Sequence, residues 1–97
     1  MDRRVVKFLA VFVLFSFALS GCYYFSAKKE ITDAEKLLSE LKGAGGEKQV
    51  PYEYCSAGGF LEAAKVEFSQ NDFGPAKGLA ERSRSAAQAG LAEIKKK

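Results

Sequence analysis

The sequence contains no histidine and no tryptophan, and only two cysteines and two prolines among its 97 residues. Without histidine it lacks the side chain that most often acts as a general base, and it lacks any cysteine–histidine pair. It also shows no metal-ligand spacing and no phosphate-binding loop. Carboxylates such as Glu62 and Glu67 are interpreted as a solvated helix face. These absences predict a protein that is not an enzyme, with no catalytic residues, no cofactor and no metal site.

Most of the chain also lacks an excess of positive or negative charge. The sequence carries 15 Lys or Arg and 12 Asp or Glu, a net charge of +3. Arg3, Arg4 and Lys7 supply this excess within residues 1–21, so the remainder is nearly neutral. Nucleic-acid-binding domains carry clustered basic charge. No nucleic-acid partner is therefore predicted.

The N-terminal segment has the pattern of a targeting sequence. Its basic residues precede an apolar run from Phe8 to Leu19 that only Ser16 interrupts. A membrane-spanning helix needs about 20 apolar residues, so this run is short for a span and matches the apolar region of a secretory signal peptide. The alternative is a retained single-pass membrane anchor.

The motif Leu19-Ser20-Gly21-Cys22 directly follows this run. It resembles the bacterial lipobox, in which a leucine and two small residues precede an obligatory cysteine. Small residues let an extended backbone enter the signal peptidase, and the thiol accepts a diacylglyceryl group. The resemblance implies a signal peptide over 1–21, cleavage before Cys22 and lipidation of Cys22. The alternative is that Cys22 is a buried helical cysteine.

Lipidation would provide a membrane anchor without a transmembrane helix. Each buried methylene contributes about 0.8 kcal/mol, so two or more acyl chains bind a membrane firmly. Tyr23 follows the cysteine where an aspartate would resemble the inner-membrane retention signal, which implies the outer membrane, facing the periplasm. Residues 22–31 are expected to form a short tether. The aromatic residues Tyr23, Tyr24 and Phe25 would either lie near the lipid headgroups or begin the first helix.

Three helices are expected after this tether, in a domain over residues 32–97. Thr32 and Glu35 have capping-box spacing, and the glycines at 43, 45 and 46 end the first helix. The apolar residues of this helix recur three and four positions apart at Ile31, Ala34, Leu37, Leu38 and Leu41. The loop from Gly43 to Val50 is glycine-rich and charged, so it is expected to face solvent.

The second and third helices are predicted to form an antiparallel hairpin. Pro51 suits a first helical turn, and Asp72 and Pro75 mark the start of the last helix. The predicted inner face of the second helix contains Tyr52, Cys55, Phe60, Leu61, Ala64 and Phe68. Gly58-Gly59 interrupts this helix, which predicts either a close crossing by a neighbouring helix or a bend. The last helix has a stripe of mostly small residues at Ala76, Leu79, Ala80, Ser83, Ala87, Leu91 and Ile94.

The fold class is therefore all-α: a signal helix, then one short helix and an antiparallel helical hairpin. No segment has the pattern of a β-strand. No uninterrupted heptad seam was identified, so a compact hairpin is expected and a long coiled coil is not. A domain of this size has a thin core.

The second and third helices share a set of residues with a known family. These are Val50-Pro51-Tyr52-Glu53-Tyr54, then Ala57, Phe60-Leu61, Ala64-Lys65 and Glu67, then Asp72-Phe73 and Ala76. This pattern resembles the lipoprotein family that carries domain of unknown function 4398. Val50, Cys55 and Gly58-Gly59 depart from the family pattern. The hairpin is also similar to a single tetratricopeptide-like unit, which lacks the groove that an array builds. The resemblance implies an envelope location and a helical hairpin, and it brings no ligand and no catalytic residues.

Two further groups of residues are candidate sites. Cys55 is either a small buried residue of the hairpin or a thiol that forms an intermolecular disulfide. Tyr52, Glu53 and Tyr54 are candidates for partner binding at the open end of the hairpin. The alternative is that Tyr52 packs on the last helix while Glu53 interacts with the helix dipole.

The chain ends in Lys95-Lys96-Lys97, where a helix C-terminus favours cations. A lipidated N-terminus and a C-terminal lysine resemble the abundant small outer-membrane lipoprotein of enteric bacteria, whose last lysine is joined to peptidoglycan. Two functions follow as hypotheses. The first is a non-catalytic interaction or scaffolding lipoprotein that binds an unknown envelope protein in the periplasm. The second is a structural spacer that links the outer membrane to peptidoglycan through Lys97.

Overall fold

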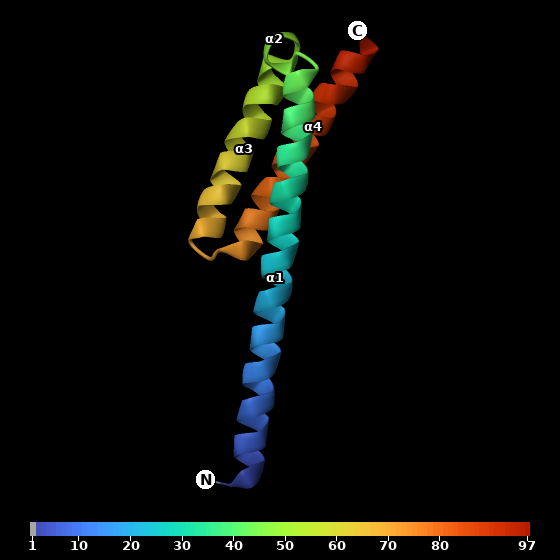
Figure 1. The fold of residues 1–97 in the computed structure, drawn as a ribbon. Coiled ribbons are helices and arrows are strands. Elements are labelled where there is room, and N and C mark those ends of the chain that lie inside the picture. Colours follow the sequence, from blue (N-terminus) through green and yellow to red (C-terminus); the bar gives the residue numbers. More distant parts are fainter. Residues whose placement is uncertain (1) are drawn as a thin grey trace.

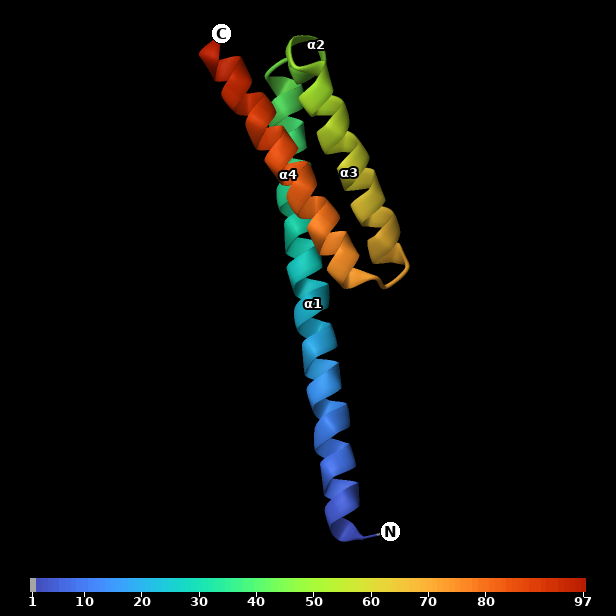
Figure 2. The same cartoon turned by 180° about the vertical axis from the view of Figure 1, so that it is seen from behind.

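The computed structural model describes residues 2–97, apart from the side chains of residues 17–21. Four helices follow one another in this part of the chain: α1 (Arg3–Gly43), α2 (Gly46–Gln49), α3 (Pro51–Ser69) and α4 (Phe73–Lys96). No residue from 2 to 97 lies in a β-strand, so the predicted all-α class is confirmed. The first half of α1 extends alone, while its second half packs beside α3 and α4 (Figure 1). The same arrangement is visible from behind, where α4 crosses α1 (Figure 2).

The helix α1 is much longer than the helix expected from Thr32 onward. The hydroxyl of Thr32 donates a hydrogen bond to the carbonyl oxygen of Lys28 at 2.9 Å, one turn earlier in the same helix. The predicted capping box at Thr32 is therefore wrong. Residues 22–31, expected to form a tether, are helical, and Ala27 and Ile31 within them are buried. The periodicity of the apolar residues simply continues upstream from Ala34, and burial of these positions favours the helix.

Each long helix of the bundle buries a seam of residues with coiled-coil spacing. The buried residues are Ala27, Ile31, Ala34 and Leu41 in α1, Ala57, Leu61 and Ala64 in α3, and Ala76, Ala80, Ser83, Ala87 and Gly90 in α4. Steps of three and four residues keep one face of a helix toward its neighbour. Most of these residues were expected on the apolar faces of the helices, whereas Ala27, Ala57 and Gly90 were not, because such small residues do not stand out from the surrounding sequence.

Glycines allow the closest approaches at the upper end of the bundle. A Cβ atom on Gly90 of α4 would lie 3.0 Å from Cδ1 of Leu41 and 3.2 Å from Cβ of Glu53. A Cβ on Gly46 would lie 2.6 Å from Cγ of Leu41. The fully buried Leu41 therefore fills the space that two glycines leave, and its side chain fixes where α2 and α4 meet α1.

A single buried polar side chain joins the two helices of the hairpin within the described residues. The hydroxyl of Ser83 donates a 2.7 Å hydrogen bond to the main-chain carbonyl of Ala57, and Ser83 has no exposed surface. A buried hydroxyl needs such a partner, because its desolvation is otherwise uncompensated. The bond sets the register of α4 against α3.

The connections between the helices lie where the sequence predicts them, with one difference. The helix α1 ends at Gly43, and Gly45 has the left-handed φ of +87° that favours glycine at a helix C-terminus. Pro51 occupies the first turn of α3, as predicted. The loop expected to face solvent instead contains the short helix α2, with Gly46 and Val50 buried. This burial explains why the loop folds back on the bundle.

Asn71, with a φ of +64°, turns the chain from α3 to α4, and Asp72 occupies the N-cap position. The position of Asp72 agrees with the prediction, but its side chain makes no capping hydrogen bond. The main-chain carbonyl of Asp72 accepts from the amide of Ala76 at 3.0 Å, which starts the helical ladder.

We predict that Gly90→Val lowers the free energy of unfolding by about 1–3 kcal/mol, because the new side chain must displace Leu41. The matched control is Gly78→Val in the same helix, where a Cβ meets nothing within 4 Å. The control is expected to change stability by less than about 0.5 kcal/mol. Urea unfolding followed by circular dichroism measures both. Equal effects of the two substitutions would contradict the close contact at Gly90.

Candidate functional site

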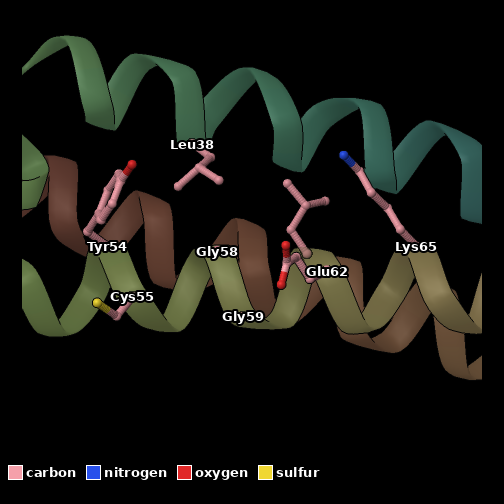
Figure 3. A pocket seen from close by; sticks show the side chains of 8 residues that line it. Leu38, Tyr54, Cys55, Gly58, Gly59, Glu62 and Lys65 are labelled. Carbon is pink, nitrogen blue, oxygen red and sulfur yellow. The ribbon is translucent and has the colours of Figure 1, made fainter.

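The three long helices do not pack equally against one another. The helix α4 contacts both α1 and α3 extensively, whereas α1 and α3 contact each other much less. On the side where α1 and α3 face each other lies a hollow of about 430 Å³. Leu38 of α1 lines it together with residues of α3, namely Tyr54, Cys55, Gly58, Gly59, Leu61, Glu62 and Lys65 (Figure 3). We call this surface the α1–α3 hollow.

The adjacent glycines Gly58 and Gly59 form part of the lining. A Cβ atom at either position would meet nothing within 4 Å. The expectation that a neighbouring helix of the chain crosses closely at these glycines is therefore wrong. Each glycine inside a helix costs about 1 kcal/mol relative to alanine, and no packing contact from the described residues offsets this cost. The two glycines leave the backbone of α3 bare on the surface of the bundle.

The side chain of Cys55 lies at the edge of the hollow, farther from α1 than the ring of Tyr54 (Figure 3). Cys55 is exposed, so the interpretation of this cysteine as a buried residue of the hairpin is wrong. It forms no disulfide within the described residues. At the other end of the hollow Lys65 pairs with Glu35 of α1, with 3.0 Å between Nζ and Oε1. Both side chains are about half exposed, so this pair contributes little to stability.

The candidate residues Tyr52, Glu53 and Tyr54 do not form one surface. Tyr52 is 79% exposed, so the expected packing of its ring on the last helix is wrong. Glu53 is half-buried, and its Cβ lies beside Gly90 of α4. Tyr54 packs against the core and points toward α1, where it lines the hollow (Figure 3). Successive positions of a helix project about 100° apart, which explains the separation.

A cluster of aromatic rings at the opposite end of the bundle was not predicted as a unit. Tyr24 of α1 lies 5.2 Å from the ring of Phe68 in α3 and 5.3 Å from that of Phe73 in α4. Phe68 and Phe73 are 5.2 Å apart. Aromatic pairs at such distances add to the stabilisation from burial. The cluster therefore joins all three long helices next to Cys22.

Cys22 is exposed on α1 and lies beside the first turns of α4. It lines a small hollow of about 210 Å³ with Tyr23, Ser26 and Lys77. The side chains of Leu19, Ser20 and Gly21, which complete the predicted cleavage motif, lie outside the described residues. Cleavage and lipidation at this position stay predictions.

An ion pair fixes the position of α1 against α4. Oε2 of Glu30 lies 3.1 Å from Nη1 of Arg84, and the side chains are 14% and 36% exposed, respectively. Oε2 is buried and not aligned for a hydrogen bond, and Oε1 accepts a long one of 3.5 Å from the same nitrogen. Only one nitrogen of Arg84 faces the carboxylate of Glu30. The main effect of the pair is to provide a counter-charge for this largely buried carboxylate.

The terminal lysine lies at the end of the bundle away from Cys22. Nζ of Lys97 donates a hydrogen bond to the main-chain carbonyl of Gln49 in α2 at 3.0 Å. Lys95, Lys96 and Lys97 are all exposed. From Cys22 to Gly43 the helix α1 rises by about 32 Å, which separates the two ends.

Across the described side chains, no three His, Cys, Asp or Glu are grouped in a way that could hold a metal ion. No helix in this part of the chain combines the length and the apolarity that crossing a membrane requires. No protein-family model, no curated protein and no solved structure matches the chain. The resemblance to domain of unknown function 4398 stays a prediction.

One carboxyl group at the α3–α4 turn has a shifted pKa. A hydrogen bond with the side chain of Asp72, helped by desolvation and by the charge of Asp72, raises the pKa of Glu67 above its usual 4.5. The protonated carboxyl stabilises the fold below the unfolded pKa, and this contribution is lost as the pH rises through the folded pKa. At neutral pH the two carboxylates repel each other.

We predict that Glu67→Gln raises the midpoint of thermal unfolding at neutral pH, because the amide still donates to Asp72 without a second negative charge. The gain should shrink as the pH falls through the raised pKa of Glu67, where Glu67 itself becomes protonated. Glu62→Gln removes the same charge from an exposed position of α3 and is the control. A pH-independent gain in the Glu67 variant would contradict the coupling to Asp72.

Proposed function

We propose that the protein is a non-catalytic envelope lipoprotein, anchored through lipid on Cys22, whose helical bundle holds another envelope protein at the α1–α3 hollow. The observation that carries this proposal is the bare backbone at Gly58 and Gly59, which no part of the described chain covers. In the proposal, the cost of two glycines inside α3 is offset when a partner packs there. The partner would be an outer-membrane or periplasmic protein.

The exposed first half of α1 supports removal of a signal peptide. Its large apolar side chains between Val5 and Phe15 are 46–77% exposed, and the bundle buries none of them. Exposed apolar surface of this extent needs a membrane or an enzyme that removes it. Cleavage before Cys22 would leave the seams of all three long helices intact, since the first buried member of α1 is Ala27.

The shape of the hollow supports a helical partner. Helices approach most closely where small residues lie at the contact, because the backbones can then come together. Gly58 and Gly59 offer such a position, and Tyr54 and Leu38 border it with apolar surface. Glu62 and Lys65 supply one charge of each sign on the rim. A helix with small residues at its crossing point and polar flanks would complete a fourth side of the bundle.

A spacer between the outer membrane and peptidoglycan is the second candidate. It is supported by the position of Lys97, which is exposed and lies at the far end of the bundle from Cys22. Covalent attachment through the Lys97 amine would require only the loss of its hydrogen bond to Gln49. Isolation of a muropeptide joined to Lys97 after lysozyme digestion would favour the spacer.

We predict that Cys22→Ala abolishes lipidation and accumulates the uncleaved precursor, because processing depends on the modified thiol. Mass spectrometry of the protein from membranes measures both the diacylglyceryl group and the new N-terminus. Cys55→Ala is the matched control, and it should be processed like the natural chain. A Cys22→Ala protein that is cleaved, or a natural chain that keeps residues 1–21, would contradict the lipoprotein proposal.

We predict that a photoreactive residue at Cys55 or Glu62 gives a discrete crosslinked band in cells. The same residue at Glu81, exposed on α4 outside the hollow, should give none. Mass spectrometry of the band would identify the partner. Absence of a band at both hollow positions would contradict the interaction proposal.

A variant that fills the hollow tests whether partner binding can be lost while the fold is kept. Gly59→Leu places a side chain where nothing lies within 4 Å, and leucine is a better helix former than glycine by almost 1 kcal/mol. The variant should be at least as stable as the natural chain and should lose the crosslink from Glu62. Gly78→Leu makes the same change on α4, and it should retain the crosslink.

A further inference from the structure

The end of the bundle that carries Cys22 has features that fit a lipid surface. We define the basal end as residues 22–28 of α1 together with the α3–α4 turn, residues 70–77. Phe25 is 71% exposed, although its ring lies 5.5 Å from that of Tyr24 in the half-buried aromatic cluster, and Tyr23 is 54% exposed. Aromatic rings with one apolar side and one wet side are enriched at membrane–water interfaces.

We infer that the basal end rests directly on the bilayer, with Phe25 and Tyr23 at the level of the headgroups and Lys77 toward the lipid phosphates. This inference depends on the proposed lipidation of Cys22. An acylated Cys22 lies at the membrane surface, and Phe25 follows it by about 4.5 Å of helix rise. A side chain so near the anchor reaches the headgroup layer when α1 stands upright.

The charges of the basal end are mixed but arranged around the anchor. Lys77 of α4 shares the small hollow with Cys22, and Lys28 lies over the ring of Tyr24 at 5.9 Å. Glu67 and Asp72 add negative charge at the turn. A basic side chain beside the anchor can bind the phosphate that every phospholipid headgroup carries. The acidic pair argues against a strong preference for anionic lipids, so the aromatic contact dominates.

The aromatic cluster makes this contact directional. Tyr24 is held by Phe68 and Phe73, so the segment after Cys22 cannot swing as a tether would. The bundle then stands with α4 and α1 rising from the membrane. The α1–α3 hollow and Lys97 are presented away from the lipid, and Leu41 lies about 28 Å above Cys22 along α1.

Because the chain has no tryptophan, a single introduced tryptophan reports on this contact. The lipidated protein with Phe25→Trp is reconstituted into phosphatidylcholine vesicles whose acyl chains are brominated near the headgroup. Bromine should quench its emission several-fold more than that of Tyr52→Trp, which is exposed at the far end of the bundle. Equal quenching of the two variants would overturn the inference.

Lys77→Glu in the Phe25→Trp background should reduce the quenching, whereas Lys96→Glu at the far end should leave it unchanged. No difference between these two variants would remove the role of Lys77. Intact mass and flotation with the vesicles test the anchor separately. A lipidated, floating protein without quenching at Phe25 overturns the basal contact and leaves the lipoprotein proposal standing. A protein without lipid that does not float overturns both.

Discussion

The close approach of α4 to α1 and α3 is the constraint on which the rest of the structure depends. Alanines dominate the seams, so each position buries little apolar area and the attraction comes from many short contacts between backbones. The 2.7 Å hydrogen bond from Ser83 to the carbonyl of Ala57 is possible only at such a distance. Gly90 and Leu41 make a similar close contact at the end of the bundle away from Cys22, where one large side chain occupies the space left by a glycine.

This mode of packing also determines which side of the bundle stays open. Because α4 takes both α1 and α3 as close neighbours, those two helices meet each other through the longer side chains of Leu38, Tyr54 and Leu61. Beside that contact the surface of α3 is shaped by Gly58 and Gly59 instead of side chains. The alanine-rich packing of α4 thus holds the three helices together and leaves the backbone of α3 uncovered at Gly58 and Gly59.

The sequence predicts the helical class, the C-terminal end of α1, the starts of α3 and α4 and the approximate place of the turns, because these depend on local chemistry. Pro51 and the glycine at 45 act within one turn of the chain. The seams are predicted only in part: Ala27, Ala57 and Gly90 were not recognised, because small residues give little contrast in hydrophobicity between the faces of a helix. The prediction of a tether is wrong for a related reason: residues 22–31 look like a separate segment until Ile31 packs in one cluster with Leu61 of α3 and Ala80 of α4.

The candidate sites also divide into one that local sequence reveals and one that requires the folded structure. The cysteine at 22 belongs to a linear motif and can be recognised without a fold, whereas the α1–α3 hollow exists only after two distant segments meet. Gly58 and Gly59 are unusual inside a helix and can be recognised in the sequence, but their environment depends on the position of α1. Tyr24 is likewise far from Phe68 and Phe73 in the sequence, and the three rings become one cluster only when α1 packs beside the hairpin.

The helical bundle begins within one turn of Cys22, where Tyr24 of α1 packs on Phe68 of α3. Hydrogen–deuterium exchange of the proposed mature chain, from Cys22 onward, is the most direct test. The first four amides of a helix have no intrahelical partner, so residues 22–25 should exchange quickly. We expect the amides of residues 27–41 to be protected as strongly as those of α4. Rapid exchange throughout residues 22–31, with protection beginning only near Thr32, would show a flexible tether and contradict it.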